Sequence, residues 1–335
     1  MGEKESPPSG ELKQKNFVSG YSLTREEFYN QLIVSSSKFI DPSLQEKFRS
    51  TNILIVGAGS VGNPIAMMAV RSGAENITVM DPDVVEVNNL SRQQYNVKQI
   101  GKNKADMTLE NMKLVNPFIE ETSRSNPSGM TLENAREYVE NSDIVVDAVD
   151  IRSLDIIYYL HKYAKEYRKP VLVGYDLAGT AMVAVYRYDK EEMDPLMGEL
   201  TEEKIWEFKS IQDAYEHGRI SQADFLNYVY DAFTGPIKPL NVPVEQLEEI
   251  IGRDPEDSRT YQLGSTSTVL SVLSVEAMRR IVAGESIKDV ILVDIPSQVR
   301  RSNPGVMSRI PLLLRTLSVL KTRAEGVKEI LNKIS

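Results

Sequence analysis

A glycine-rich stretch is the part of this sequence that most directly indicates chemistry. Residues 57–62 read GAGSVG; they follow the apolar run NILIV and precede residues that can open a helix. Gly57, Gly59 and Gly62 let the backbone turn tightly and let a phosphate approach the free N–H groups of a helix N-terminus. Asp81 follows Gly62 by 19 residues, at the end of the next apolar run, where a carboxylate can accept hydrogen bonds from ribose hydroxyls. This spacing predicts a nucleotide-binding turn.

Charged and amide side chains follow the ends of neighbouring apolar runs. They are Asp83, the NNLSRQ segment at 88–93, the GKNK segment at 101–104, and Asp150. The carboxyl ends of parallel strands form the edge at which such sheets bind ligands. A triphosphate carries more charge than a nicotinamide dinucleotide and usually brings magnesium, so Arg92 and Lys104 suit its oxygens and Asp150 suits the metal. Taken singly, each of these three could also form a surface ion pair or cap a helix.

The elements that hold these residues alternate between strand and helix. Short apolar runs predict strands, and residues 102–115 predict a helix. The predicted strands are residues 52–56, 75–81, 142–150, 171–176, 180–188 and 290–294. Such alternation implies right-handed crossovers and a parallel sheet. We expect residues 180–188 to run antiparallel, because the link before them is too short for a crossover.

Two segments depart from this pattern and carry opposite charge. Residues 190–257 contain 17 acidic and 6 basic side chains, a balance of −11, and apolar residues recur there at helical spacing. Residues 299–335 contain 8 basic and 2 acidic side chains, a balance of +6, and predict an amphipathic helix in which Leu313, Leu317 and Leu320 form a core or dimer stripe. The predicted fold class is therefore α/β: a Rossmann-like, mostly parallel sheet flanked by helices, with a helical insertion and a helical C-terminal segment.

The composition removes several classes of protein. The chain has 335 residues, 41% hydrophobic and 26% charged, and no apolar run approaches the roughly 18 to 20 residues that cross a bilayer. Cysteine is absent and histidine occurs only at His161 and His217, so neither a thioester nor a zinc site is expected. The net charge of −9 argues against a broad nucleic-acid surface, and a cytoplasmic location is expected.

Taken together, the motifs resemble the ThiF, MoeB and ubiquitin-activating enzyme family, whose members adenylate a carboxylate with ATP. The glycine triad, DPDVVEVNNLSRQ, GKNKAD and VVDAVD follow one another in the family order. The resemblance implies ATP and Mg²⁺ as cofactors, without zinc. By this resemblance, the adenosine end of ATP would be bound by Gly57, Gly59, Gly62 and Asp81, with Ser60 and Asp83 beside it. The phosphates would be bound by Asn89, Arg92 and Lys104. The magnesium would be bound by Asp150. Arg92, Lys104 and Asp150 are then the predicted catalytic residues.

The same resemblance shows two departures from the family pattern. Many relatives carry an arginine before the first strand that reaches the nucleotide across a dimer, whereas Gln31 stands at the aligned position. Arg25, Arg300 or Arg301 could substitute for it. Ser60 stands where relatives usually have glycine.

The expected function follows from the resemblance and the missing cysteine. A homodimer would adenylate the C-terminal glycine of a small ubiquitin-like or sulfur-carrier protein, or a peptide, and release the product to an external nucleophile. Three alternatives stay open: a non-catalytic nucleotide-binding subunit, an NAD-dependent oxidoreductase and a tRNA-modifying member of the family. The predicted divisions are a disordered tail (1–20), the ATP-binding adenylation core (21–189), the acidic helical insertion (190–262), a segment that completes the core (263–298) and the basic helical C-terminal segment (299–335).

Overall fold

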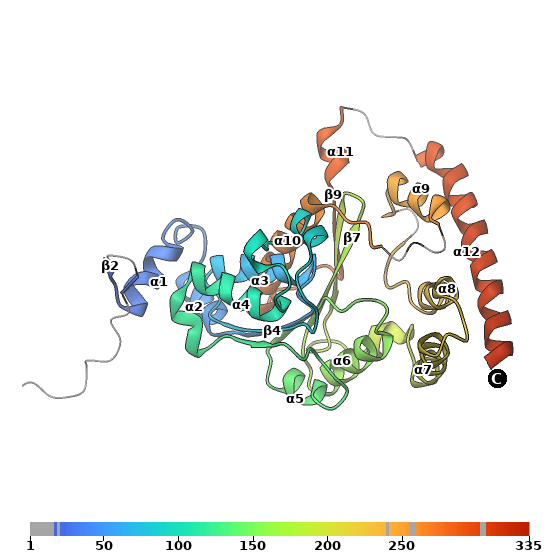
Figure 1. Ribbon diagram of the computed structural model, residues 1–335. Helices are drawn as coiled ribbons and strands as arrows, with labels where there is room; N and C mark the ends of the chain where they lie inside the picture. Colours follow the sequence, from blue (N-terminus) through green and yellow to red (C-terminus); the bar gives the residue numbers. More distant parts are fainter. Residues whose placement is uncertain are drawn as a thin grey trace, which may run out of the picture.

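A seven-stranded sheet forms the centre of the protein, for which we describe a computed structural model (Figure 1). The structure describes residues 17–18, 21–238, 241–254, 257, 259–301 and 306–334. The strand order is β5-β4-β3-β6-β7-β8-β9. The strands are β3 (Asn52–Val56), β4 (Asn76–Met80), β5 (Arg124–Asn126), β6 (Ile144–Asp147), β7 (Val171–Leu177), β8 (Thr180–Tyr186) and β9 (Val290–Asp294).

The sheet is mostly parallel, which confirms the predicted fold class. The pairs from β5 to β7 are all parallel, whereas β7 with β8 and β8 with β9 are antiparallel. Ala178 and Gly179 connect β7 to β8 with φ values of 45° and 98°. Two central residues with positive φ match the right-handed twist of the flanking strands, so the link makes a tight hairpin.

Both faces of the sheet are covered by helices, because its central strands are apolar on both sides. Ile53 and Ile55 of β3 pack with α2, α3, α4 and α10, whereas Leu54 and Val56 pack with α5 and α6. Figure 1 shows these two groups of helices on opposite sides of the sheet. Their bounds are α2 (Pro42–Ser50), α3 (Gly62–Arg71), α4 (Lys104–Val115), α5 (Ala135–Glu140), α6 (Leu154–Glu166) and α10 (Gly264–Val282).

The acidic insertion and the basic C-terminal segment pack against each other. The insertion forms the short η4 (Pro195–Gly198) and the helices α7 (Glu202–Glu216), α8 (Gln222–Ala232) and α9 (Val244–Gly252). The long helix α12 (Val306–Ile334) lies across α8 and α9 (Figure 1). Arg300 also pairs with Glu245 of α9, with 2.7 Å between Nη2 and Oε1. The basic segment therefore neutralises part of the insertion's negative charge within the chain.

The predicted divisions of the chain into five segments stay predictions. Residues 1–16, 19 and 20 of the predicted tail lie outside the described residues, as does the side chain of Leu320. Leu317 is 51% exposed. No helix in the described part of the chain is long and apolar enough to cross a membrane. The other elements are β1 (Phe17–Val18), β2 (Tyr21–Ser22), α1 (Arg25–Ile33), η1 (Val87–Ser91), η2 (Val97–Gln99), η3 (Pro117–Glu121) and α11 (Ile295–Val299).

Candidate functional site

The glycine-rich turn lies between β3 and α3, and two of its three glycines are required by the fold itself. Gly57 has φ of 97°, and a Cβ there would lie 2.1 Å from the carbonyl oxygen of Ala148. A Cβ on Gly62 would lie 1.8 Å from the carbonyl oxygen of Gly57. Gly59 differs, because the nearest described atom to its Cβ position is Gln93 Nε2, at 4.0 Å. Gly59 thus leaves open space in front of the turn.

Backbone donors for an anion lie just before α3 and at its first residue, Gly62, because Pro64 has no N–H and the N–H of Asn63 already donates to the carbonyl oxygen of Gly59. The residue at its N-cap, Val61, makes no side-chain hydrogen bond to the helix. The first N–H groups of an α-helix have no carbonyl partner within the helix, and the helix dipole adds a partial positive charge there. The open space at Gly59 lies at this end, so the turn has the form of a phosphate-binding site.

Asp81 follows β4 and holds the glycine-rich turn in place. Its Oδ2 accepts a 2.6 Å hydrogen bond from the N–H of Ala58, and its Oδ1 accepts a 2.8 Å bond from the N–H of Asp83. The side chain is 6% exposed, and burial raises its pKa although these bonds act in the opposite direction. Asp81 therefore orders the two loops around the site. Its contact with a ribose stays a prediction.

Lys104 is the first residue of α4, and it pairs with Asp83. Lys104 Nζ lies 2.9 Å from Asp83 Oδ2; the lysine side chain is 11% exposed and the aspartate 68%. Asn103 caps α4 and also donates a 2.8 Å hydrogen bond to the carbonyl oxygen of Asp81. The cap thereby fixes the start of α4 beside the end of β4, which brings Lys104 and Asp83 to the same edge as the glycine-rich turn.

Tyr95 is a buried residue of this site that the sequence motifs did not identify. Its hydroxyl lies 2.7 Å from the carbonyl oxygen of Ala58, 3.1 Å from that of Lys104 and 2.9 Å from Thr108 Oγ1. Burial raises its pKa, so it stays a neutral hydrogen-bonding group. Tyr95 therefore ties the glycine-rich turn to α4. The only signal in the sequence is an aromatic residue two positions after the NNLSRQ segment.

Arg92 and Ser60 are joined by a residue from a distant part of the chain. Gln262 Oε1 accepts a 2.7 Å hydrogen bond from Ser60 Oγ and a 3.1 Å bond from Arg92 Nε. Gln262 lies just before α10, whose first residue, Gly264, approaches the 88–93 segment so closely that a Cβ would lie 2.4 Å from the carbonyl oxygen of Ser91. The guanidinium of Arg92 is thus fixed beside the glycine-rich turn.

Asn89 and Gln93 belong to the same segment and differ in whether their side-chain oxygens have a hydrogen-bond partner. Asn89 is buried, and its Oδ1 accepts a 2.9 Å hydrogen bond from the N–H of Glu86. Gln93 is 6% exposed, and its Oε1 has no hydrogen-bond partner among the described residues. A buried amide oxygen without a partner costs free energy, so Gln93 is a further candidate for contact with a ligand near Gly59.

Asp150 lies after β6 and forms a bidentate pair with Arg152. Arg152 Nε lies 2.9 Å from Asp150 Oδ1, and Nη2 lies 2.7 Å from Oδ2. Burial acts to raise the pKa of Asp150, but hydrogen bonds from Arg152 outweigh it, so the net pKa is lowered. The charge of the Lys104 ammonium adds to the lowering. Arg152 is a third cation at the site, and no motif in the sequence pointed to it.

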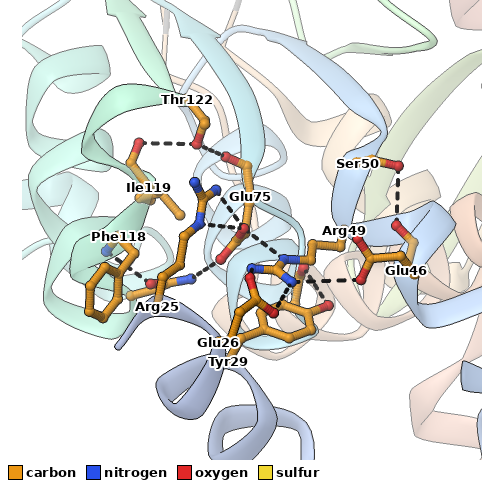
Figure 2. Close-up of polar contacts among 12 residues, drawn as sticks. Arg25, Glu26, Tyr29, Glu46, Arg49, Ser50, Glu75, Phe118, Ile119 and Thr122 are labelled. Carbon is orange, nitrogen blue, oxygen red and sulfur yellow. Dashed lines mark hydrogen bonds and ion pairs between the residues drawn. The ribbon is translucent and has the colours of Figure 1, made fainter. Parts of the chain in front are cut away.

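Arg25, one of the proposed substitutes for the missing arginine, lies away from the glycine-rich turn. Figure 2 shows Arg25 and Arg49 on either side of Glu75, and Arg25 Nη2 lies 2.7 Å from Glu75 Oε2. Glu75 precedes β4 and Asp81 follows it, so they lie at opposite edges of the sheet, about 20 Å apart along the strand. Arg300 is paired with Glu245. Gln31 is exposed on α1.

Both histidines have polar partners outside the glycine-rich turn. His161 is fully buried, with Nδ1 2.8 Å from the hydroxyl of Tyr188 and Nε2 3.2 Å from Asp147 Oδ2. His217 is exposed and lies against Asp213 of its own helix. No group of three or more His, Cys, Asp or Glu side chains that could hold a metal occurs in the part of the chain that the structure describes.

Comparison with known proteins identifies the family. The ThiF family model matches residues 29–295. The chain is 31% identical over 186 residues to the adenylyltransferase and sulfurtransferase UBA4 of Lodderomyces elongisporus, covering 54% of this chain and 40% of that protein. It is 30% identical over 169 residues to a sulfur carrier protein adenylyltransferase of Thermus thermophilus, covering 49% and 60%. The chain thus matches less than two thirds of the length of either relative.

Solved structures share the fold. The structure superposes on E. coli tRNA N6-threonylcarbamoyladenosine dehydratase with a TM-score of 0.53 and 19% identity, over 78% of this chain and 98% of that one. At this identity the likeness concerns the fold alone. The family match spans the glycine-rich turn, both loops that carry Arg92 and Lys104, and the end of β6 with Asp150. The chain belongs to the ThiF family.

Proposed function

We propose that this protein is an adenylyltransferase that activates a carboxylate with ATP. The observation that supports the proposal is the order of the strands: Arg92 and Lys104 follow β4 and Asp150 follows β6, and these are the two parallel neighbours of β3, which leads into the glycine-rich turn. A triphosphate suits two cations, backbone donors and one hard carboxylate better than a dinucleotide does. Relatives that are named adenylyltransferases support the same reaction.

The reaction needs positioning and charge more than proton transfer. A carboxylate oxygen of the substrate attacks the α-phosphorus of ATP, the bond to the β-phosphate oxygen breaks, and acyl-adenylate and pyrophosphate form. A terminal carboxylate is already ionised, so no general base is required. Arg92, Lys104 and the N–H groups at the start of α3 would hold the phosphates and stabilise the charge that shifts onto pyrophosphate. Asp81, through Ala58, keeps the turn in shape.

Magnesium fits the donor set on one condition, that the nucleotide completes its coordination. Mg²⁺ is commonly held by one or two carboxylates together with phosphate oxygens and water. Asp150 offers such a carboxylate, because its side chain is 47% exposed at the edge of the sheet. When bound, the ion would neutralise phosphate charge and polarise the reacting phosphoryl group.

The substrate that we propose is the C-terminal glycine of a ubiquitin-like or sulfur-carrier protein, or of a peptide. The support is a relative that is named a sulfur carrier protein adenylyltransferase. The chain contains no cysteine, so the activated acyl group would pass to an external nucleophile and not to an enzyme thiol. We further propose a homodimer located in the cytoplasm; light scattering after size-exclusion chromatography and cell fractionation test these two points.

The decisive experiment is ATP–pyrophosphate exchange with a synthetic peptide ending in Gly-Gly, beside titrations of ATP and NAD. ATP at a hundredfold excess over its dissociation constant should stabilise the protein by about 2.7 kcal/mol, and NAD should not. Arg92→Ala, Lys104→Ala and Asp150→Asn should each lose roughly tenfold or more in ATP affinity or exchange, the effect of one charge-assisted hydrogen bond. Lys113→Ala is the matched control, because that lysine lies on α4 and pairs with Glu120 on the surface.

Three outcomes would change the assignment. Stronger stabilisation by NAD than by ATP would contradict adenylation and favour an oxidoreductase. Tight ATP binding without exchange for any carboxylate would favour a non-catalytic nucleotide-binding subunit, which the exposed Gln31 would explain. Full affinity and exchange in the Arg92, Lys104 and Asp150 variants would show that the site is wrongly placed.

A further inference from the structure

Arg152 and Asp150 form an ion pair that lies inside the candidate site. Both side chains are 47% exposed, and they sit in the turn that joins β6 to α6. Exposed pairs of this kind contribute little to folding stability. The turn does not depend on the guanidinium, because the backbone N–H of Arg152 also donates a 2.9 Å hydrogen bond to Asp150 Oδ1. The pair is therefore free to separate without loss of the local structure.

The surroundings of the guanidinium place it among the groups proposed to bind phosphate. The hydrogen bonds that Arg152 donates to Asp150 raise the pKa of Arg152 most, and the charge of Asp83, the partner of Lys104, raises it further. The segment that carries Arg152 follows β6, the parallel neighbour of β3, and the carbonyl oxygen of Ala148 lies 2.1 Å from the Cβ position of Gly57. Arg152 thus follows β6 at the same edge of the sheet as the glycine-rich turn.

We propose that Arg152 changes partner during the reaction: it holds Asp150 before Mg²⁺ and ATP bind, and it contacts the polyphosphate once Asp150 coordinates the metal. This inference rests on the proposed function. One carboxylate cannot give both oxygens to a guanidinium fork and also serve as a magnesium ligand at full strength. A guanidinium released beside a triphosphate finds the acceptor geometry that suits its paired donors.

The exchange of partners accounts for the glutamine at position 31. An arginine that contacts the transferred phosphate can come from the same chain or from a partner, and its loss costs orders of magnitude in rate. Arg25 is held by Glu75 at the opposite edge of the sheet, and Arg300 pairs with Glu245 of the insertion. Arg152 is a cation already at the edge where the nucleotide would bind, and it would supply this charge within the chain.

The inference predicts that removing Arg152 affects the metal and the nucleotide in opposite directions. In Arg152→Ala, Asp150 loses its competing partner, so the Mn²⁺ concentration that gives half of the maximal α,β-methylene-ATP binding should fall severalfold. At saturating Mn²⁺ the same variant should bind α,β-methylene-ATP about tenfold more weakly, the loss of one charge-assisted bond. Arg152→Lys should recover part of the nucleotide affinity. Asp150→Asn should lose the metal response.

The control is Arg168→Ala, which removes a more exposed arginine that pairs with Glu192. It should leave both titrations unchanged, and thermal unfolding of the variants should match wild type. Unchanged metal and nucleotide affinities in Arg152→Ala, with Lys104→Ala still impaired, would overturn the inference and leave the proposed function standing. Weaker binding of Mn²⁺ in Arg152→Ala would also overturn it. If wild type binds no ATP, both the proposed function and this inference fail.

Discussion

The N–H of Ala58 donates a 2.6 Å hydrogen bond to Asp81 Oδ2, which joins the glycine-rich turn to the end of the neighbouring strand. The second carboxylate oxygen, Oδ1, accepts a hydrogen bond from the N–H of Asp83, whose side chain forms the ion pair with Lys104. One buried side chain therefore sets the relative position of the two loops at the candidate phosphate site. Nucleotide binding and local stability should depend on it together.

Replacing Asp81 tests this coupling. In Asp81→Asn one of the two N–H donors faces an amide N–H₂ group and loses its acceptor, which costs about 1 to 3 kcal/mol of unfolding free energy. ATP affinity should fall as well, because the turn loses its anchor. Asp83→Asn is the control for stability: its side chain is 68% exposed, so the loss should stay below about 1 kcal/mol. Urea unfolding measures the stability and titration measures the ATP affinity. Equal losses of stability in Asp81→Asn and Asp83→Asn would contradict the anchoring role.

The three glycines of the turn should respond differently to alanine. Gly57→Ala and Gly62→Ala each place a Cβ within 2.1 Å or 1.8 Å of a backbone oxygen, so each should cost about 2 kcal/mol or more in stability. Gly59→Ala meets open space and should change stability by less than about 0.5 kcal/mol. Its methyl group should nevertheless weaken ATP binding roughly tenfold, about 1.4 kcal/mol, by filling the phosphate space. A Gly59→Ala protein that binds ATP normally would place the phosphate elsewhere.

Asp176 on β7 should make stability depend on pH. Burial raises its pKa to about 6 from 3.8, although a hydrogen bond from Ser267 Oγ acts in the opposite direction. The folded chain therefore holds this proton more tightly than the unfolded chain, and stability decreases as pH rises from about 4 to about 6. Asp176→Asn should match wild type near pH 4 and exceed it at pH 7. Urea unfolding midpoints of both proteins at pH 4 and pH 7 test this. If the variant differs from wild type by the same amount at both pH values, the raised pKa of Asp176 is refuted.

The ion-pair cluster in Figure 2 should contribute to folding stability and not to nucleotide binding. Glu75 is 2% exposed and lies 2.7 Å from Arg25 and 2.8 Å from Arg49, so Glu75→Gln should cost about 3 to 5 kcal/mol. Arg25→Ala leaves Arg49 in place, and Arg25 is 38% exposed, so about 1 kcal/mol or less is expected. Pyrophosphate exchange should survive Arg25→Ala. A large fall there would mean that Arg25 serves the site after all.

Much of the sheet could be predicted from the sequence, because its central strands are apolar on both faces and end at residues with special roles. The run at 52–56 becomes β3, and Gly57 directly after it has the positive φ that ends the strand. The antiparallel turn at 178–179 follows from the short link. Local pattern is sufficient where one element and its own turn decide the outcome.

Pairings between distant segments could not be predicted in this way. Gln262 meets Ser60 across 202 positions, and no periodicity in either segment indicates that contact. The motifs predict a metal role for Asp150 but carry no signal for the guanidinium two residues later, since an arginine at a helix start is common on surfaces. The packing of the basic segment on the acidic insertion also depends on tertiary structure.

The place of β9 in the sheet has a consequence for synthesis of the chain. All seven residues of β8 are buried, and β9 covers its outer edge only after residues 187–289 have been made. At 5 to 20 residues per second the ribosome takes roughly 5 to 20 s over that stretch. Throughout this interval the backbone N–H and C=O groups along one side of β8 lack their final partner, and an open strand edge is a template for wrong pairing. The nascent protein is therefore most exposed to aggregation, and most dependent on chaperones, during translation of its own acidic insertion.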